Sequence, residues 1–243
     1  MKKKIIDNIR TLLYALIIAL IIRSLFFQPF YIPSSSMEST LLVGDRLFVS
    51  KYTYGYSKHS FPFSPKFSDK RFFFKDPKRG DVIVFKTPSD NRTDYIKRLI
   101  GLPGDEIQFI NGDLYLNNNQ ILKTKAFKED LQINCSGNLL DSISYIEKLP
   151  NGVTYTAVYN KIGSYKNSDR YIVPKDHYFF LGDNRDCSKD SRFLNSVGYV
   201  SKLNLVGKAR VIFFSTDKNI GNFFQVWNWS KMIRWNRLFT KIE

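Results

Sequence analysis

The sequence has little cysteine and little histidine. Its 243 residues include two of each: Cys135, Cys187, His59 and His177. Two cysteines are too few for a scaffold held together by disulfides, and the sequence leaves open whether they pair. The four residues also lack the close paired spacing of zinc ligands. We therefore expect neither a metal ion nor a cofactor, and a chain of this length can bury a sizeable hydrophobic core.

Acidic residues are scarce relative to basic ones. The 37 lysines and arginines outnumber the 22 aspartates and glutamates, which gives a formal net charge of +15 at pH 7. A charge of this size indicates an anionic partner or surface. Nucleic acid and an anionic membrane are the two candidates that a strongly basic chain most often binds.

The N-terminal segment decides between these two candidates. Residues 1–10 carry four basic side chains, and residues 11–31 form a long apolar stretch in which Arg23 is the only charge. This stretch is long enough to span a bilayer as a helix, which the proline at position 29 should end at or before Gln28. The basic residues before the span predict that residues 1–10 are cytoplasmic and that residue 32 onward lies outside.

An uncleaved anchor fits the sequence better than a cleaved signal peptide. A signal peptide would need small residues close behind the apolar run, whereas bulky residues separate that run from Ser34 and Ser36. We therefore predict a single-pass protein of a bacterial inner (plasma) membrane, with its main domain on the outer or periplasmic side. Anionic lipids then explain the positive charge, and no nucleic-acid partner is expected.

Beyond the anchor, the sequence predicts a mostly β protein. Tyr, Phe and Trp make up 16% of the chain, and long helical patterns are rare after residue 31. Strand-like runs lie at 82–86, 94–100, 171–173, 178–181 and 206–214, and Asn111-Gly112 predicts a hairpin. We expect a core formed by 32–110 and 171–216, with 111–170 inserted as a small β excursion.

The C-terminal tail, residues 217–243, combines apolar and basic side chains. Met232, Trp235, Leu238 and Phe239 recur at helical spacing, and basic residues recur on another face. This pattern predicts a basic amphipathic helix that lies on an anionic surface. A helix docked on the protein itself is the alternative.

Three consecutive serines, Ser34, Ser35 and Ser36, lie just beyond the anchor. Serine-rich segments are common linkers, but a serine at the mouth of a domain is also a candidate nucleophile. Its hydroxyl is inert at neutral pH unless a nearby base takes the proton. The usual base is histidine, and a triad of Ser36, His177 and an aspartate is compatible with the sequence because triad members are distant along a chain.

Lys97 is a second candidate for the base. It lies inside the apolar run 94–100, on the same face as Tyr95 and Leu99, whereas Arg98 points to the opposite face. A buried lysine readily loses its proton, but its pKa must fall by roughly three units from about 10.4 to act near neutral pH. The alternative is an edge residue whose ammonium group reaches water.

Four sequence blocks follow the anchor in order. They are PSSSMESTLLVGD at 33–45, RGDVIVF at 79–85, YIKRLIGLPGD at 95–105 and GDNRDCSKDSR at 182–192. In these blocks the sequence resembles the type I signal peptidases (leader peptidases), membrane-anchored serine proteases that remove signal peptides from exported proteins. The resemblance covers the catalytic core and is weakest in 111–170 and in the tail. It implies an antiparallel-sheet core, a Ser/Lys dyad and no cofactor.

The resemblance implies a role for several residues of these blocks. Ser36 corresponds to the nucleophile and Lys97 to the general base. The Ser36 backbone N–H and the Ser34 hydroxyl would form the oxyanion hole. Ser188 matches the serine that orients the lysine. The pairs Arg98 with Asp183 and Arg192 with Asp190 would shape the site.

The substrates that the resemblance implies are signal peptides of exported preproteins. Such peptides carry small residues at the first and third positions before the cut. Shallow pockets lined by Phe30, Ile32, Tyr95 and Ile96 would exclude larger side chains. The peptide would bind in an extended form along a sheet edge.

The sequence departs from the family pattern at two positions. Ser39 stands where the family usually has proline, which predicts a less rigid turn, and Cys187 stands where a polar residue other than cysteine is common. Two other functions compete with the protease. A self-cleaving repressor would need a pair of DNA-binding helices where this chain has an anchor. A membrane-tethered basic binding protein without catalysis leaves the four blocks unexplained.

Overall fold

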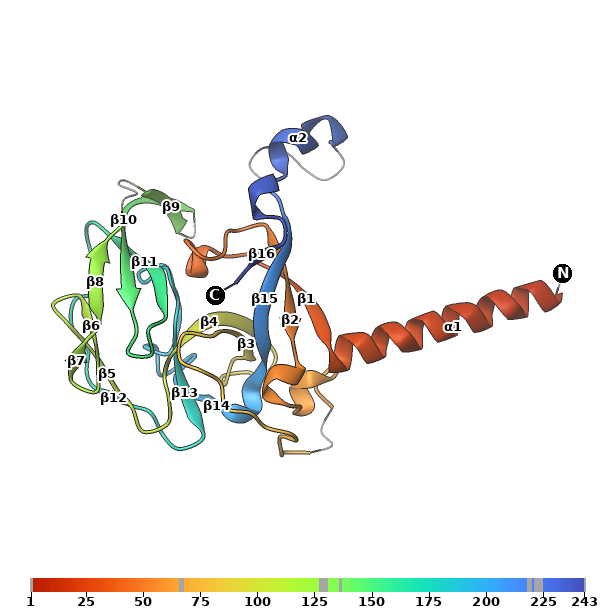
Figure 1. The fold of residues 1–243 in the computed structure, drawn as a ribbon, viewed down its shortest axis with the longest axis horizontal. Helices are drawn as coiled ribbons and strands as arrows, with labels where there is room; N and C mark the ends of the chain where they lie inside the picture. Colours follow the sequence, from red (N-terminus) through yellow and green to blue (C-terminus); the bar gives the residue numbers. More distant parts are fainter. Residues whose placement is uncertain are drawn as a thin grey trace.

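The computed structural model describes residues 2–65, 68–126, 131–135, 137–217, 220 and 225–242. Small parts of the expected excursion and tail therefore lie outside the described residues. In the described part, one long helix extends from a body made of two β lobes (Figure 1).

Helix α1 spans Lys2–Leu25 and projects away from the body (Figure 1). Within its segment Lys3–Leu25, the most apolar stretch of 18 residues has a mean hydropathy of 2.0, and none of that stretch is buried. Among the described residues, it is the one helix long and apolar enough to cross a membrane. The predicted end at or before Gln28 is confirmed. The apolar stretch that follows differs from the expected anchor, because residues 27–31 pair as a strand instead of continuing the helix.

The first lobe is an eight-stranded antiparallel sheet. Its strand order is β1 (Phe27–Tyr31), β2 (Asp45–Ser50), β15 (Leu205–Ser215), β3 (Val82–Lys86), β4 (Asp94–Gly101), β13 (His177–Leu181) and β14 (Val200–Ser201), and β16 (Thr240–Lys241) also pairs with β15. Pro29 is tolerated because β1 is an edge strand, where one row of N–H groups needs no partner. The strands predicted at 82–86, 94–100, 178–181 and 206–214 are confirmed.

The second lobe consists of two smaller sheets. One orders β12 (Tyr171–Ile172), β5 (Glu106–Ile110), β6 (Asp113–Leu116) and β7 (Asn119–Gln120); the other contains β8 (Leu122–Lys125), β9 (Leu131–Cys135), β10 (Asn138–Lys148) and β11 (Thr154–Asn160). The predicted hairpin is confirmed, with φ of 51° at Asn111 and 86° at Gly112, as a type I′ turn requires. The lobe begins with β5, before the boundary expected at residue 111.

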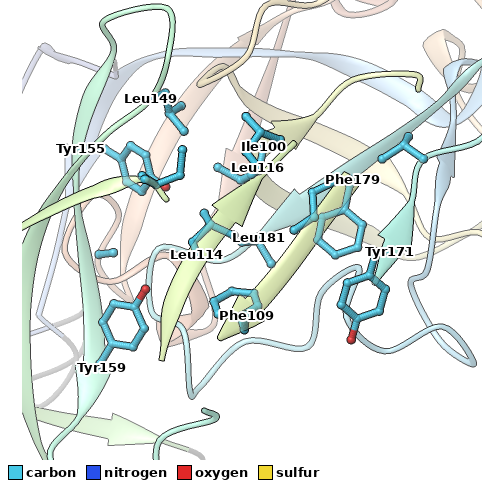
Figure 2. Packing of buried hydrophobic residues seen from close by; sticks show 14 residues of the cluster. Ile100, Phe109, Leu114, Leu116, Leu149, Tyr155, Tyr159, Tyr171, Phe179 and Leu181 are labelled. Atoms are coloured by element: carbon cyan, nitrogen blue, oxygen red, sulfur yellow. The ribbon is translucent and has the colours of Figure 1, made fainter. Parts of the chain in front are cut away.

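A hydrophobic cluster joins the two lobes (Figure 2). Phe179 and Leu181 of β13 pack with Phe109 and Leu114 of the second lobe, and all four side chains are at most 1% exposed. Burying an aromatic or aliphatic side chain of this size contributes about 1.5–3 kcal/mol. The packing fixes strand β13, and with it the loop 182–192 that follows, between the lobes.

The C-terminal tail does not form the predicted continuous helix. Its described part contains only α2 (Trp229–Met232) and short 3₁₀ turns at Val226–Asn228 and Trp235–Arg237, before β16. Arg237 forms an ion pair with the buried Asp45, and Arg234 donates to the carbonyl of Val43 at 2.9 Å. The tail therefore docks on the first lobe, because these cations find partners there that a continuous surface helix could not reach.

The aromatic segment 52–78 is divided between the domain and its surface. It includes 3₁₀ turns at Tyr52–Tyr54 and Lys58–Ser60. Tyr54 is buried and donates its hydroxyl to Asp81 at 2.7 Å. Phe63 and Phe73, in contrast, are almost fully exposed. Some aromatic residues of this segment therefore pack on the domain, and others lie at its surface.

Candidate active site

Ser36 lies in a 3₁₀ turn, Ser35–Met37, directly after β1. The turn is fixed by Met37 and Leu41, which are fully buried in a core cluster with the strands of the first lobe. Ser36 itself is 8% exposed. The serine segment is therefore a structured part of the domain, and the linker interpretation is wrong.

Lys97, which lies on strand β4, contacts Ser36. Its Nζ lies 2.6 Å from Ser36 Oγ and donates to the carbonyl of Ile96 at 3.0 Å. The side chain is only 3% exposed, so its amine does not reach bulk water. The interpretation of Lys97 as an edge residue with a solvated ammonium group is thus wrong.

Burial determines the acidity of Lys97. Desolvation lowers the pKa of its amine to about 8, while the carboxylates of Asp190 and Asp183 oppose this shift. Among the described residues, Lys97 has no carboxylate ion-pair partner within 4.0 Å. The amine is consequently able to exist in its neutral form near physiological pH.

Two hydrogen-bond donors lie beside Ser36 Oγ. The Ser36 backbone N–H is in the first turn of a 3₁₀ helix, whose leading N–H groups have no acceptor within the helix. Ser34 precedes this turn with an extended backbone, and its side chain does not cap the helix. Its hydroxyl lies 3.4 Å from Ser36 Oγ. Both groups can therefore face an oxygen atom bound at Ser36.

Arg98 and Asp183 form a buried ion pair on the opposite face of β4. The Arg98 Nε lies 2.8 Å from Asp183 Oδ1, and Nη2 lies 2.8 Å from Oδ2. Both side chains are 1% exposed. Thr40 donates to the same carboxylate at 2.5 Å. This pair ties the loop after β13 to the turn that follows Ser36.

Asp190 and Arg192 form a second bidentate pair, with distances of 2.8 and 2.9 Å. Burial alone would raise the pKa of Asp190. The lowering by Arg192 and by the Gly182 backbone N–H is larger, so the pKa is lowered overall and the carboxyl stays ionised. The Ser188 hydroxyl makes no hydrogen bond of good geometry with any described residue, although it lies close enough to Asp190 to contribute to the lowering. The orientation of Lys97 by Ser188 stays a prediction.

A cleft of about 410 Å³ opens at Ser36 and Lys97. All four residues predicted for the substrate pockets, Phe30, Ile32, Tyr95 and Ile96, line it together with Ser34. The residues predicted for the dyad, for the substrate pockets and, in part, for the oxyanion hole therefore line one cleft.

Neither histidine contacts Ser36. His59 Nδ1 pairs with the Ser64 hydroxyl at 3.0 Å, and His177 Nδ1 lies 2.8 Å from the carbonyl of Lys175. The hydrogen bonds of the Ser36 hydroxyl among the described residues lead only to Lys97 and Ser34. The Ser-His-Asp triad is thus excluded.

Sequence reasoning missed a buried charged cluster behind the site. Arg185 pairs with Glu147, and the hydroxyls of Tyr155 and Tyr159 bond to both partners at 2.6–2.8 Å. The position of Arg185 within the block 182–192 was the only signal. Its partner lies on β10, in the region where the resemblance is weakest, so no spacing in the sequence connects them.

Two further features were open or misjudged in the sequence. Cys135 and Cys187 form a disulfide, with their Cα atoms 5.6 Å apart. Ser39 has φ of 83° and donates its hydroxyl to the carbonyl of Thr156 at 2.7 Å. Proline is restricted to φ near −65°, so it could not adopt this conformation. The turn therefore excludes proline at this position, and the hydrogen bond of Ser39 holds the turn to β11.

Comparisons with known proteins agree with this geometry. The family model described as "Signal peptidase, peptidase S26" matches residues 5–214. Proteins named Signal peptidase I from Rickettsia akari and Rickettsia conorii are 40% and 41% identical to the chain, and each alignment covers 94% of this chain and 90% of the relative. A crystal structure of a signal peptidase I from Enterococcus faecalis is 28% identical and covers 55% of this chain and 97% of that chain; its TM-score of 0.32 is too low to support an argument about the fold. The chain belongs to the signal peptidases of peptidase family S26.

Proposed function

We propose that Ser36 and Lys97 form the catalytic dyad of this membrane signal peptidase, which cleaves signal peptides from exported preproteins. The observation that supports the proposal is the 2.6 Å contact between Lys97 Nζ and Ser36 Oγ at a cleft. With a pKa of about 8, about a tenth of the Lys97 amines are neutral at pH 7. That fraction is sufficient for a general base.

The reaction is acyl transfer. Neutral Lys97 directs one N–H at the Ile96 carbonyl, which leaves its lone pair for the Ser36 hydroxyl proton. Ser36 Oγ attacks the scissile carbonyl carbon, and the C–N bond then breaks as Lys97 returns the proton to the leaving amine. Water next attacks the acyl-enzyme, with Lys97 again as base, and releases the new carboxyl terminus and free Ser36.

The oxyanion of each tetrahedral intermediate is stabilised at the turn of Ser36. We assign this role to the Ser36 N–H and the Ser34 hydroxyl, both of which lie beside Ser36 Oγ without a competing helix-capping bond. Donors preorganised in this way typically contribute 10²–10³-fold to kcat each.

The signal peptide binds extended along β4. Residues 94–97 of this strand pair with β3 on one side only, because pairing with β13 on the other side begins at Arg98. The free edge can therefore accept an added strand. Phe30, Ile32, Tyr95 and Ile96 then restrict the pockets beside it to small side chains.

The anchor and the exposed aromatic residues hold the cleft at the outer membrane surface. Basic residues in the first turns of α1 favour a cytoplasmic N-terminus, and Phe63 and Phe73 are suited to the headgroup region beside the emerging anchor. Anionic lipids account for the net charge better than nucleic acid does, because a membrane-spanning helix already brings the domain to lipid. Protease accessibility of the domain in right-side-out and inverted vesicles tests this orientation.

One assay tests the dyad. The full chain in detergent is incubated with a preprotein, and cleavage by the wild type is compared with that by Ser36→Ala, Lys97→Ala and the control Lys58→Ala, whose charge lies in an exposed ion pair. We expect no detectable cleavage by the first two variants and normal cleavage by the control. Cleavage by either dyad variant at the wild-type rate would refute the proposal, and a membrane-tethered binding protein would cleave nothing in any form.

A further inference from the structure

The turn that carries Ser36 is held from two sides. From the loop after β13, the Asn184 backbone N–H donates to the Ser36 carbonyl and its side-chain amide donates to the Ser35 carbonyl, both at 3.2 Å. From the second lobe, the carbonyl of Asn134 in β9 accepts the Ser35 hydroxyl at 2.8 Å. The position of the nucleophile therefore depends on where the loop and β9 lie relative to each other.

The two elements that hold the turn are joined covalently. Cys135 follows Asn134 in β9, and its disulfide partner Cys187 belongs to the same loop as Asn184. The Cys187 backbone N–H also donates to the Asn184 side-chain carbonyl at 3.3 Å, which orients that amide. These contacts close a ring that runs from the serine turn through the loop, across the disulfide and along β9 back to Ser35.

Besides the buried side chain of Ile133, the disulfide and one hydrogen bond to Ser35 are the restraints that the structure describes for β9 outside its own hairpin. Within the described residues, the hydrogen bonds of β9 beyond its pairing with β10 and the hairpin turn lead only to Ser35. Figure 1 shows this hairpin at the end of the second lobe that faces the segment after β1. A single neutral hydrogen bond contributes little net stability, so without the disulfide it would hold β9 weakly against the serine turn.

We propose that Cys135 and Cys187 are positioning residues, whose disulfide clamps β9 onto the serine turn and keeps Ser36 Oγ within reach of Lys97 Nζ. The proposal rests on the catalytic role of Ser36 given above. The pocket residues Phe30 and Ile96 lie on β1 and β4, outside the ring, so the clamp acts on kcat more than on KM. Because Cys187 also lines the cleft, reduction of the wild type, which leaves both cysteine side chains in place, is the form in which KM is most informative. A disulfide persists on the oxidising outer side of a bacterial membrane, and the enzyme therefore becomes fully active only after its own domain has been exported.

The test measures kcat and KM for preprotein cleavage by the full chain in detergent. The forms compared are the wild type, Cys135→Ser, Cys187→Ser and the double variant, each before and after treatment with a dithiol, which transfers two electrons and two protons to the disulfide. Reduction of folded wild-type enzyme avoids any defect in folding. Gln132→Ala, which removes a hairpin bond to Asp141 outside the ring, is the matched control.

We expect kcat to fall about tenfold in all three cysteine variants and in reduced wild type, since a displacement of about 1 Å can cost up to 10²-fold. KM should stay within about twofold, reoxidation should restore the wild type, and the dithiol should not affect the variants. The double variant should be no worse than either single variant, because the two sulfurs act as one unit. Gln132→Ala should keep its kcat in the oxidised state.

Three results would overturn the positioning role. They are an unchanged kcat in Cys135→Ser, a loss in the double variant equal to the product of the single losses, and a reduced wild type with full activity. Ser35→Ala adds a second criterion, because it opens the ring at its hydrogen bond. Reduction should then cause little further loss, and a loss as large as that of the wild type would also refute the clamp. If Ser36→Ala still cleaves, the dyad itself is wrong, whereas an inactive Ser36→Ala with fully active cysteine variants refutes the clamp alone.

Discussion

Two regions of the molecule each bury a lysine, and they differ in what the lysine touches. Lys97 lies in β4 at the cleft, and Lys51 follows β2 near the end of the anchor. Both side chains are at most 3% exposed, and burial lowers the pKa of each amine to about 8. Lys51 donates to the carbonyl of Ser60, whereas Lys97 lies against a serine hydroxyl.

The comparison shows that a lowered amine pKa does not by itself make a lysine catalytic. A lowered pKa makes an amine able to accept a proton, but only Lys97 has a hydroxyl proton within hydrogen-bond distance and a cleft that admits a substrate. Burial alone is therefore a weak indicator of a catalytic lysine. The nucleophile beside the amine distinguishes the two regions.

The largest expected effect comes from replacing each lysine with methionine, which fills a similar volume without the amine. Lys97→Met should lower kcat by at least about 10³-fold, because neither step of acyl transfer then has a general base. Lys51→Met should leave kcat within about threefold. Preprotein cleavage in detergent measures both, and a Lys51→Met enzyme as inactive as Lys97→Met would remove the distinction between the regions.

Removing a carboxylate near Lys97 should affect stability strongly. Asp183→Asn leaves the buried Arg98 without a countercharge, which should cost about 3–5 kcal/mol of unfolding free energy. Asp69→Asn breaks the exposed ion pair with Lys58 and should cost less than about 1 kcal/mol. Denaturant unfolding in detergent gives both values. Equal losses of unfolding free energy would show that the buried Arg98–Asp183 pair contributes no more to stability than the exposed pair.

The position of Ser36 can be disturbed without changing either lysine. A Cβ at Gly182 would lie 2.4 Å from the Ser36 carbonyl oxygen and 2.2 Å from Ser188 Oγ. Gly182→Ala should therefore displace the nucleophile and lower kcat about 10²-fold. Gly104→Ala, where a Cβ meets no atom within 4 Å, is the control and should keep its kcat despite the strain at its positive φ. Normal cleavage by Gly182→Ala would contradict this account.

The pH–rate profile should report only one of the two lysines. With neutral Lys97 as the proposed base, kcat/KM should rise about tenfold per pH unit below the pKa of about 8 and level off above it. Lys51→Met should show the same ascending limb. A limb near the pKa of a solvated lysine, or one that moves in Lys51→Met, would contradict the assignment of Lys97.

The pH dependence of stability should report both lysines. Each amine has a pKa of about 8 in the folded state and about 10.4 when unfolded, so the unfolded chain binds more protons between these values. Burial of the ammonium is thus unfavourable below pH 8, and the cost disappears as the pH rises toward 10.4. The slope is at most about 1.4 kcal/mol per pH unit for each lysine. Unfolding of Lys51→Met between pH 8 and 10 should show a smaller slope than the wild type, and an identical slope would exclude a contribution from Lys51.

Strand positions and the partners at the cleft could be predicted from the sequence. The run 82–86 is mostly apolar, and the run 94–100 contains Tyr, Leu and two Ile residues. Turn signals flank both runs, so their local pattern indicates strands in any mostly β fold. The resemblance then named Ser36 and Lys97, and the structure brings them together. In contrast, nothing local distinguishes Lys97 from a solvated lysine, because its amine lies against Ser36, a residue far away along the chain.

In the C-terminal tail, the local sequence pattern gave the wrong prediction. Its apolar and basic residues fit a helix, yet Arg234 and Arg237 bind Val43 and Asp45 of a distant segment, and β16 pairs with β15. Tertiary hydrogen bonds and ion pairs outweighed the modest helical propensity of a segment that has few strong helix formers. Similarly, the disulfide needed Cα atoms 5.6 Å apart, a distance that no spacing in the sequence reveals.

The sequence by itself determined the anchor, the β character of the body and the residue types able to carry out Ser/Lys chemistry, because these depend on local hydropathy, periodicity and side-chain identity. Only the tertiary structure decided which buried lysine faces a hydroxyl, how the serine turn is held and where the tail lies. Those outcomes depend on contacts between segments far apart in the chain, whose burial sets both the distances and the pKa of Lys97.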